Sequence, residues 1–254
     1  MEKPIGLPIL PSSWMDTGCL SKRPFNRVVS LFWSDARNLL QHAWSMVFPR
    51  RWVVIFILIV GTLLVCSIMS VDLPILASIR FESTTSEGES IKTIARVMSY
   101  WGDFAGFNLF VFAILTCFAF IRRSAFFRRM TVAAVLGTVL TGGIANGVRI
   151  TAGRARPGSK LEPGFYGPTF SARKQSFPSA HTATSFGASV PVAVAFPPAG
   201  IPMLLVSGGV AWSRMQNNCH HPSDVLASLM LSMLFGIPLG LAVRRIGREQ
   251  RPNA

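Results

Sequence analysis

The sequence predicts an all-α integral membrane protein, a bundle of six transmembrane helices preceded by an N-terminal interfacial amphipathic helix. Three observations predict this fold class. Half of the 254 residues are hydrophobic and only 14% are charged. Long apolar runs recur along the chain, several of them close to the roughly 20 residues that cross a bilayer as a helix. Basic residues gather between alternate runs, as they do in the cytoplasmic segments of membrane proteins.

The first fifty residues precede the membrane domain. Residues 1–23 are rich in Pro and Ser and show no hydrophobic periodicity, which predicts a cytoplasmic tail. Apolar residues then recur at helical spacing and predict an amphipathic helix on the inner leaflet. A helix packed against the bundle or against a partner subunit explains the same spacing. The apolar face comprises Val29, Phe32, Trp33, Ala36, Leu40, Ala43, Trp44 and Val47.

Six apolar runs are the candidate spans of a membrane domain over residues 51–245. The first begins too far along the chain for a secretory signal peptide, so it is expected to be retained. Residues 246–254 are expected to form a second cytoplasmic tail. The runs are 52–71, 104–121, 130–148, 181–196, 201–212 and 225–243.

The basic residues predict the orientation of the bundle. They are concentrated before the first run, between the second and third runs, and after the last run. Cytoplasmic segments are enriched in Lys and Arg, so both termini are expected in the cytoplasm and the number of spans is even. The formal charge of +14 therefore indicates topology in the cytoplasmic (inner) membrane, and no nucleic-acid partner is expected.

One basic segment lies on the unexpected side. By this topology the segment between the third and fourth runs is extracytoplasmic, which predicts that it binds an anion there. Attraction of anionic lipid head groups is the alternative. Its basic residues are Arg149, Arg154, Arg156, Lys160, Arg173 and Lys174.

Small and polar residues in the third run predict how it packs. Gly143 and Gly147 form a G-x-x-x-G pair, which predicts the close approach of a neighbouring helix. Asn146 lies between them and is expected to face the interior, because exposing its amide to lipid is costly. The four cysteines are scattered along the chain, so they imply no disulfide framework.

Three polar stretches stand beside apolar runs: Arg149 to Pro157, Ser176 to His181 with the sequence Ser-Phe-Pro-Ser-Ala-His, and Ser213 to Asp224, which contains Arg214 and His220. Pro222 suits the first turn of a helix, which places Asp224 in that turn and His220 at its mouth. An Asp four residues after a His can reach one ring nitrogen and leave the other nitrogen free as a nucleophile or base.

Together these stretches resemble the three-part signature of the type-2 phosphatidic acid phosphatase superfamily, which includes bacterial acid phosphatases and vanadium-dependent haloperoxidases. The resemblance covers roughly residues 50–245. It implies that His220 is the nucleophile that forms a phosphohistidine, that Asp224 orients it, and that His181 is the general acid. The phosphoryl oxygens are implied to bind to Arg149, Arg156, Ser179, Arg214 and the backbone N–H of Ala180.

Two positions depart from the family pattern, and the residues around His220 allow other readings. Arg149 stands where Lys is common and Ala180 where Gly is usual. His221 is an alternative nucleophile, but it lacks the four-residue spacing to Asp224. A metal site formed by the two histidines and Asp224 is another alternative, and the nearby arginines oppose it because they repel cations. Arg154 has no matching role and is expected to contact a lipid head group or to be solvated.

The resemblance implies a metal-independent lipid phosphatase without a cofactor, whose partners are a lipid phosphate substrate and membrane lipids. Its site is expected to face the periplasm or cell exterior. Candidate substrates are phosphatidic acid, phosphatidylglycerol phosphate, undecaprenyl diphosphate and the phosphate of a lipid A. Two other functions stay open: a lipid phosphotransferase that uses the same histidine, and a non-enzymatic lipid-binding or translocating protein.

Overall fold

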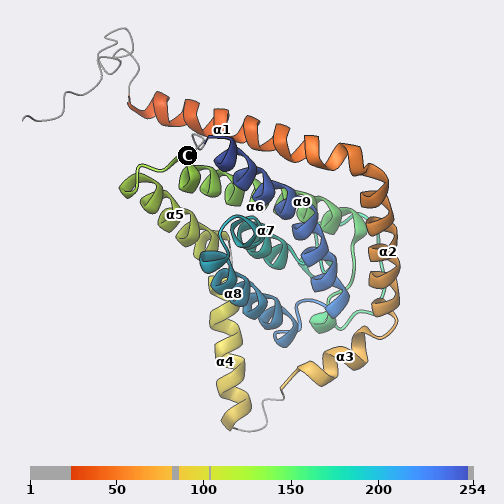
Figure 1. The fold of residues 1–254 in the computed structure, drawn as a ribbon. Helices are drawn as coiled ribbons and strands as arrows, with labels where there is room; N and C mark the ends of the chain where they lie inside the picture. The colour runs from red at the N-terminus through yellow and green to blue at the C-terminus, as the bar shows by residue number, and fades with distance from the viewer. Residues whose placement is uncertain (1–23, 82–85, 103, 251–254) are drawn as a thin grey trace, which may run out of the picture.

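The described residues form helices that are joined by loops, the longest of which runs from Gly153 to Ser179. The computed structural model describes residues 24–81, 86–102 and 104–250 (Figure 1). The predicted tail 1–23, Glu82 and the last four residues of the second predicted tail lie outside the described residues. The helices are α1 (Pro24–Val47), α2 (Arg51–Met69), α3 (Asp72–Ile79), α4 (Ser86–Trp101), α5 (Leu109–Ile121), α6 (Ala125–Ala152), α7 (Ala180–Ala195), α8 (Pro197–Gln216) and α9 (Pro222–Glu249).

Each apolar run predicted from the sequence falls on a helix. Among the described residues, three helical stretches are long and apolar enough to cross a membrane: Val28–Met69, Ala125–Ala152 and Pro222–Glu249. Gly106–Ile121 is a shorter apolar helix. The all-α membrane class is therefore confirmed. α6 and α9 are each 28 residues long and extend beyond the predicted runs at both ends.

α7 lies at the centre of the bundle, in contact with α6, α8 and α9 (Figure 1). It has 16 residues, and most of its side chains are small or carry a hydroxyl group. Hydroxyl groups join it to its neighbours: Ser189 and Ser207 hydroxyls lie 2.7 Å apart, and the Thr141 and Ser232 hydroxyls donate to the Ala183 carbonyl. Such residues let helices approach closely inside a membrane bundle. α7 thus contacts protein on most sides.

The closest contact between α6 and α7 uses a different face of α6 from the predicted one. A Cβ atom at Gly143 or Gly147 would meet no heavy atom within 4 Å, so the predicted G-x-x-x-G contact is wrong. A Cβ atom at Gly137 would instead collide with the backbone of Gly187 on α7, and one at Gly142 would collide with Thr184. Successive residues point about 100° apart around a helix, so a shift of one position selects another neighbour.

We expect Gly137→Ala to lower the free energy of unfolding by about 1–3 kcal/mol, because the added methyl group forces the two helix backbones apart. Gly143→Ala is the matched control on the same helix, and its open surroundings should keep the change within about 0.5 kcal/mol. Thermal unfolding in detergent measures both. Equal effects of the two variants would contradict the contact.

α1 crosses the end of the bundle over α6 and α9 (Figure 1). Leu39 is fully buried against the core, whereas Trp33 and Trp44 are 65% and 64% exposed. Asp35, also buried, pairs with Arg128 at 2.5 Å and with Arg129 at 3.4 Å, both on the first turn of α6. α1 therefore has one face bound to the bundle and an aromatic face turned away from it.

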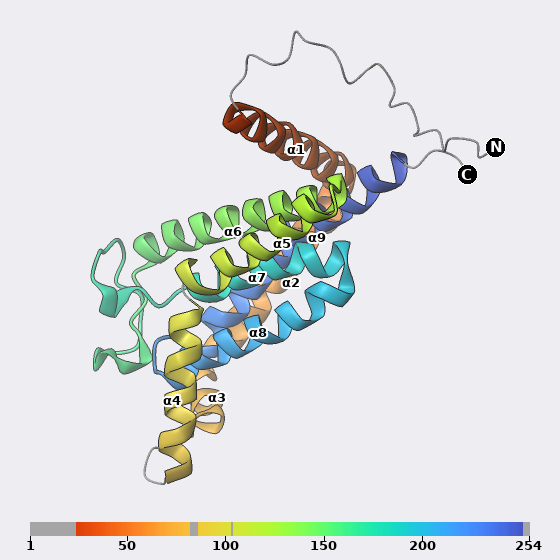
Figure 2. The same ribbon diagram turned by 90° about the vertical axis from the view of Figure 1, so that its left-hand side faces the viewer.

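α3 and α4 lie toward the other end of the bundle, in the segment that joins the first and second apolar runs (Figure 2). α4 packs against α8, and the Asn217 amide donates to the Ala95 carbonyl at 3.1 Å. The Gln216 side chain exchanges two hydrogen bonds with the backbone of Phe81, at 2.9 and 3.0 Å. These contacts tie the segment after α2 to the last turn of α8, next to His220.

Candidate active site

The three predicted stretches meet at the end of the bundle opposite α1. α6 ends at Ala152, because Gly153 adopts a left-handed φ of 62° and donates its N–H to the Arg149 carbonyl. A Cβ atom at Gly153 would also collide with the backbone of Gly167. Arg149 therefore stands on the last turn of α6, whereas Arg156 lies in the loop beyond it. This loop runs on to the first turn of α7 and contacts the loop between α8 and α9.

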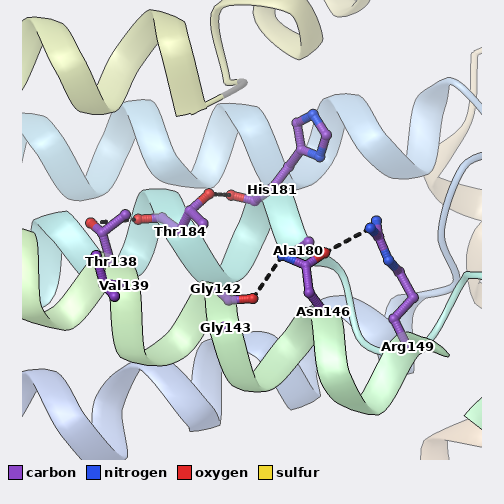
Figure 3. Close-up of a pocket in the computed structure, with 9 residues that line it drawn as sticks. All are labelled: Thr138, Val139, Gly142, Gly143, Asn146, Arg149, Ala180, His181 and Thr184. Atoms are coloured by element: carbon purple, nitrogen blue, oxygen red, sulfur yellow. Dashed lines mark hydrogen bonds between the residues drawn. The ribbon is translucent and has the colours of Figure 1, made fainter. Parts of the chain in front are cut away.

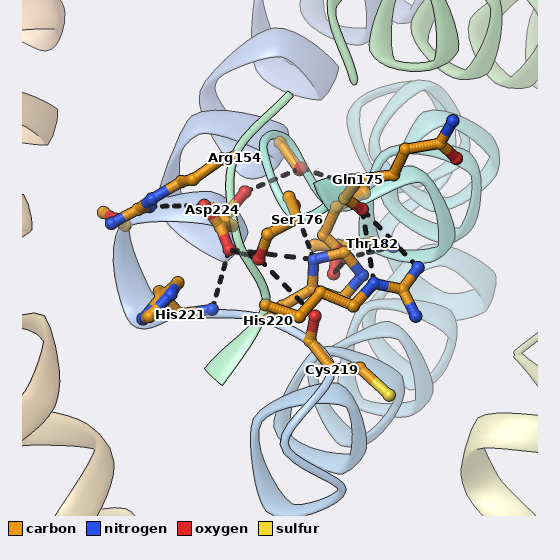
Figure 4. Close-up of polar contacts among 12 residues, drawn as sticks. Arg154, Gln175, Ser176, Thr182, Cys219, His220, His221 and Asp224 are labelled. Carbon is orange, nitrogen blue, oxygen red and sulfur yellow. Dashed lines mark hydrogen bonds and ion pairs between the residues drawn. The ribbon is translucent and has the colours of Figure 1, made fainter. Parts of the chain in front are cut away.

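The imidazole of His220 is buried and held by a backbone carbonyl (Figure 4). Its Nδ1 lies 2.6 Å from the Ser176 carbonyl oxygen, which can only accept a hydrogen bond, so Nδ1 carries the proton. Nε2 of the neutral ring is then unprotonated, and it has no hydrogen-bond partner among the described residues. A buried nitrogen with a free lone pair is the form that a nucleophile requires.

Asp224 lies close to His220, but its Oδ2 atom accepts hydrogen bonds from other residues. Its Oδ2 is 3.8 Å from His220 Nδ1, an ion-pair distance that is too long for a hydrogen bond. The same oxygen accepts the Ser176 hydroxyl at 2.5 Å and the His221 backbone N–H at 2.7 Å. Ser176 therefore connects the two residues, since its hydroxyl donates to Asp224 while its carbonyl accepts from His220.

The surroundings of His220 favour the neutral ring. Burial lowers the pKa of His220 below its usual value of 6.5, and the positive charges of Arg214 and Arg156 act in the same direction. The carboxylate of Asp224 opposes them by stabilising the protonated form. Burial outweighs the carboxylate, so His220 is neutral at pH 7 and its Nε2 is available.

His221 is also buried, but it points elsewhere. Its Nε2 lies 3.2 Å from the Ala155 carbonyl, and its backbone N–H caps the first turn of α9 through Asp224. Figure 4 shows the two histidine rings on different sides of the Asp224 carboxylate. The structure thus distinguishes the two neighbouring histidines by their backbone partners.

Three arginines surround the nucleophile candidate. Arg149 donates to the Asn146 side chain at 2.7 Å, and its buried Nε has no hydrogen-bond partner among the described residues. Arg156 contacts the Gln175 carbonyl at 3.4 and 3.5 Å, and Arg214 donates to the Ser99 hydroxyl on α4. Arg156 and Arg214 act electrostatically on both Arg149 and His220, so the three guanidinium groups converge on one region. Converging cations favour a multiply charged anion such as phosphate.

A cavity of about 330 Å³ opens beside these arginines between α6 and α7 (Figure 3). Arg149, Ala180 and His181 line it together with Asn146, which is exposed at this cavity and is not buried in the bundle interior as expected. Ser179 caps α7: its Oγ accepts the Thr182 hydroxyl at 2.9 Å, and its carbonyl accepts the Ser228 hydroxyl at 2.9 Å from α9. His220 does not line this cavity. The charges of Arg156 and Arg214 act both on Arg149, which lines it, and on His220.

Four buried residues of the site were assigned no part in it from the sequence: Asp72, Arg154, Ser176 and Ser223. Arg154 was expected to contact a lipid head group or solvent, but it is buried and donates to Asp224 at 2.5 Å, to Asp72 at 2.6 Å and to the Ser223 hydroxyl at 2.7 Å. Ser176 and Ser223 directly flank motif residues. The signal for Asp72 is weaker: it is a carboxylate between Val71 and Leu73, immediately after an apolar run.

The described residues offer little to a metal ion. No group of three or more His, Cys, Asp or Glu side chains among them is arranged to hold one. The oxygens of Asp224 already accept from a guanidinium, a hydroxyl and a backbone N–H. The local chemistry is therefore that of an anion site.

The fold is similar to that of one solved membrane protein, and a second solved structure gives a weaker match. A phosphatidylglycerolphosphate phosphatase of the PAP2 type from Bacillus subtilis superposes with a TM-score of 0.53 at 15% identity, covering 79% of this chain and 98% of that one. LpxE from Aquifex aeolicus gives a TM-score of 0.48 at 18% identity, covering 69% of this chain and 95% of that one. No curated protein sequence matches the chain. The sequence profile of the PAP2 superfamily matches residues 130–248, which contain all three polar stretches. Residues 130–248 are therefore similar in sequence to the PAP2 superfamily.

Proposed function

We propose that the protein is an integral membrane lipid phosphatase that hydrolyses a lipid phosphate monoester or diphosphate through a phosphohistidine on His220. One observation carries this proposal. The Nε2 atom of His220 is buried, unprotonated and without a partner among the described residues, and it lies in the field of Arg156 and Arg214. A neutral imidazole beside converging cations suits attack on a phosphorus atom that is surrounded by negative oxygens.

In the proposed reaction His220 Nε2 attacks phosphorus, a P–N bond forms, and the P–O bond to the lipid breaks. His181 gives its proton to the leaving oxygen. It then takes a proton from water, whose oxygen attacks phosphorus and releases phosphate and free His220. Phosphoryl transfer depends mainly on positioning and on stabilising the oxygens. Arg149, Arg156, Arg214, Ser179 and the Ala180 N–H supply that stabilisation, so the proposed mechanism needs no divalent ion.

A lipid substrate is supported by where the site lies. The cavity that contains Arg149 and His181 opens between α6 and α7, at the end of a helix long and apolar enough to span the bilayer. The similar Bacillus subtilis structure is a phosphatidylglycerolphosphate phosphatase. Phosphatidylglycerol phosphate, phosphatidic acid, undecaprenyl diphosphate and a lipid A phosphate are the substrates to compare.

We also propose that α2 and α5 to α9 form six spans of the cytoplasmic membrane, as one domain over residues 51–245. α1 and the end of α9 lie at one end of the bundle, and the site lies at the other (Figure 2). With the basic segments on the cytoplasmic side, the site faces the periplasm or cell exterior. The exposed Trp33 and Trp44 of α1 would then rest on the inner leaflet.

The test is phosphate release by the detergent-purified protein from these four lipids, with and without excess chelator. We expect release from at least one lipid, unchanged by the chelator. Absence of release from every lipid would contradict the hydrolase. Dependence on a divalent ion would contradict the metal-independent mechanism. Phosphate that appears on an added acceptor lipid, and not in solution, would indicate a phosphotransferase.

A further inference from the structure

A buried chain of charges connects α3 to the carboxylate behind His220. Asp72, the first residue of α3, is 2% exposed and accepts from the Ser223 N–H at 2.9 Å and the Ser223 hydroxyl at 2.5 Å. Ser223 stands in the first turn of α9, so Asp72 satisfies an N–H that would otherwise be unpaired at the start of that helix. Asp72 lies outside the region that matches the family.

Arg154 bridges the two carboxylates with the two ends of its guanidinium. Nη2 donates to Asp72 Oδ2 at 2.6 Å, and Nη1 donates to Asp224 Oδ1 at 2.5 Å. The guanidinium carbon lies 5.5 Å from the centre of the Phe165 ring. Because Arg154 occupies Oδ1, the other oxygen of Asp224 is turned toward Ser176 and His220. A fork of donors can set the rotation of a carboxylate in this way, whereas a single point charge cannot.

We infer that Arg154 and Asp72 are a positioning pair for the nucleophile. They fix the orientation of Asp224 and set the net charge that His220 experiences. The inference rests on the proposed function for its kinetic consequences, but its electrostatic consequence concerns His220 alone. Neither residue touches the reacting atoms, so both act through Asp224.

The charges that face His220 determine the sign of each effect. Asp224 on α9 carries a negative charge; Arg214 on α8 and Arg156 in the loop carry positive charges; Asp72 and Arg154 stand behind Asp224. The titratable residues Cys219 and His221 adjoin His220 in the chain, and His221 is held against the Ala155 carbonyl. Asp72, Arg154 and Asp224 together contribute one net negative charge. Removing Arg154 makes this sum more negative, whereas removing the charge of Asp72 makes it zero.

The test measures the titration of His220 by NMR of ¹⁵N-histidine-labelled protein, in Arg154→Gln and Asp72→Asn. Wild-type His220 should titrate below its usual pKa of 6.5. Arg154→Gln should raise this midpoint and Asp72→Asn should lower it, each by about one pH unit. The double variant restores the sum of charges, so its midpoint should return close to the wild-type value.

The pH profile of phosphate release supplies the kinetic readout. Neutral His220 is the nucleophile, so activity falls as the pH drops through its pKa. The acid limb should move to higher pH in Arg154→Gln and to lower pH in Asp72→Asn. With Asp224 free to rotate in Arg154→Gln, kcat at the optimum should fall by roughly tenfold to a hundredfold. KM should stay within about twofold, because other arginines bind the phosphoryl group.

Asp35→Asn is the matched control, since Asp35 is a buried carboxylate paired with arginines at the opposite end of α6. It should leave the His220 titration and the acid limb unchanged. Shifts in the same direction in both test variants, or no shift in either, would overturn the positioning pair. If Arg154→Gln does not fold, the direction of the Asp72→Asn shift decides. Failure of wild type to release phosphate from any lipid would count against the proposed function alone, because the NMR titration does not depend on turnover.

Discussion

Replacing His220 with asparagine is expected to reduce phosphate release by roughly 10⁴-fold or more, the scale seen when a covalent nucleophile is removed. The asparagine amide can still donate to the Ser176 carbonyl, which His220 Nδ1 contacts at 2.6 Å. It has no nitrogen lone pair that can attack phosphorus. The variant therefore separates loss of the nucleophile from loss of the contact. Phosphate release measures turnover. Trapping of radiolabelled phosphate on the protein, followed by exposure to acid or alkali, tests for the phosphohistidine.

His42→Asn is the matched control for this experiment. His42 lies on α1, 3.5 Å from Glu249 and at the end of the bundle away from the site. The His42→Asn variant should retain wild-type phosphate release. It should also carry the alkali-stable, acid-labile label that is expected of a phosphohistidine. Full turnover in His220→Asn, or a label that survives in it, would move the nucleophile to another residue, and His221 would be examined next.

Asp224→Asn is expected to lower the free energy of unfolding by about 3–5 kcal/mol, because it breaks a buried ion pair from one side. The carboxylate accepts from Arg154, Ser176 and the His221 N–H. An amide offers only one oxygen and turns an NH₂ group toward donors, so at least one of these groups loses its partner. Phosphate release should also fall by roughly 10²- to 10³-fold, since the imidazole loses the carboxylate that stabilises its positive charge on phosphorylation.

Asp35→Asn again provides the comparison, now for stability. It removes a carboxylate that is 3% exposed and paired with two arginines, so a loss of stability is expected there as well. Its phosphate release per folded molecule should remain that of wild type. Thermal unfolding in detergent and initial rates measure both variants. A stable and active Asp224→Asn would show that the buried network contributes little to either property.

The sequence by itself determined the helical membrane class and carried the resemblance to the PAP2 superfamily. Length and apolar composition are local properties of a run, so the positions of α2, α5, α6 and α9 follow from them without knowledge of neighbours. The motif residues were identified by their resemblance to a family signature, each part of which lies beside such a run. Sequence reasoning did not predict α3 as a separate helix, because its eight residues directly follow the first apolar run and are too few to span a bilayer. The position of α4 against α8 depends on tertiary contacts such as that of Asn217 with Ala95.

The tertiary structure decided which residues act together. The face of α6 that meets α7 depends on rotation about the helix axis, so Gly137 makes the close contact and Gly143 does not. The hydrogen-bond partner of His220 is the backbone carbonyl of Ser176, and a carbonyl has no side-chain signature in a sequence. Arg154 joins Asp72 and Asp224 across separations of 82 and 70 residues. Buried charges must be paired, and the fold alone decides which charges are buried side by side.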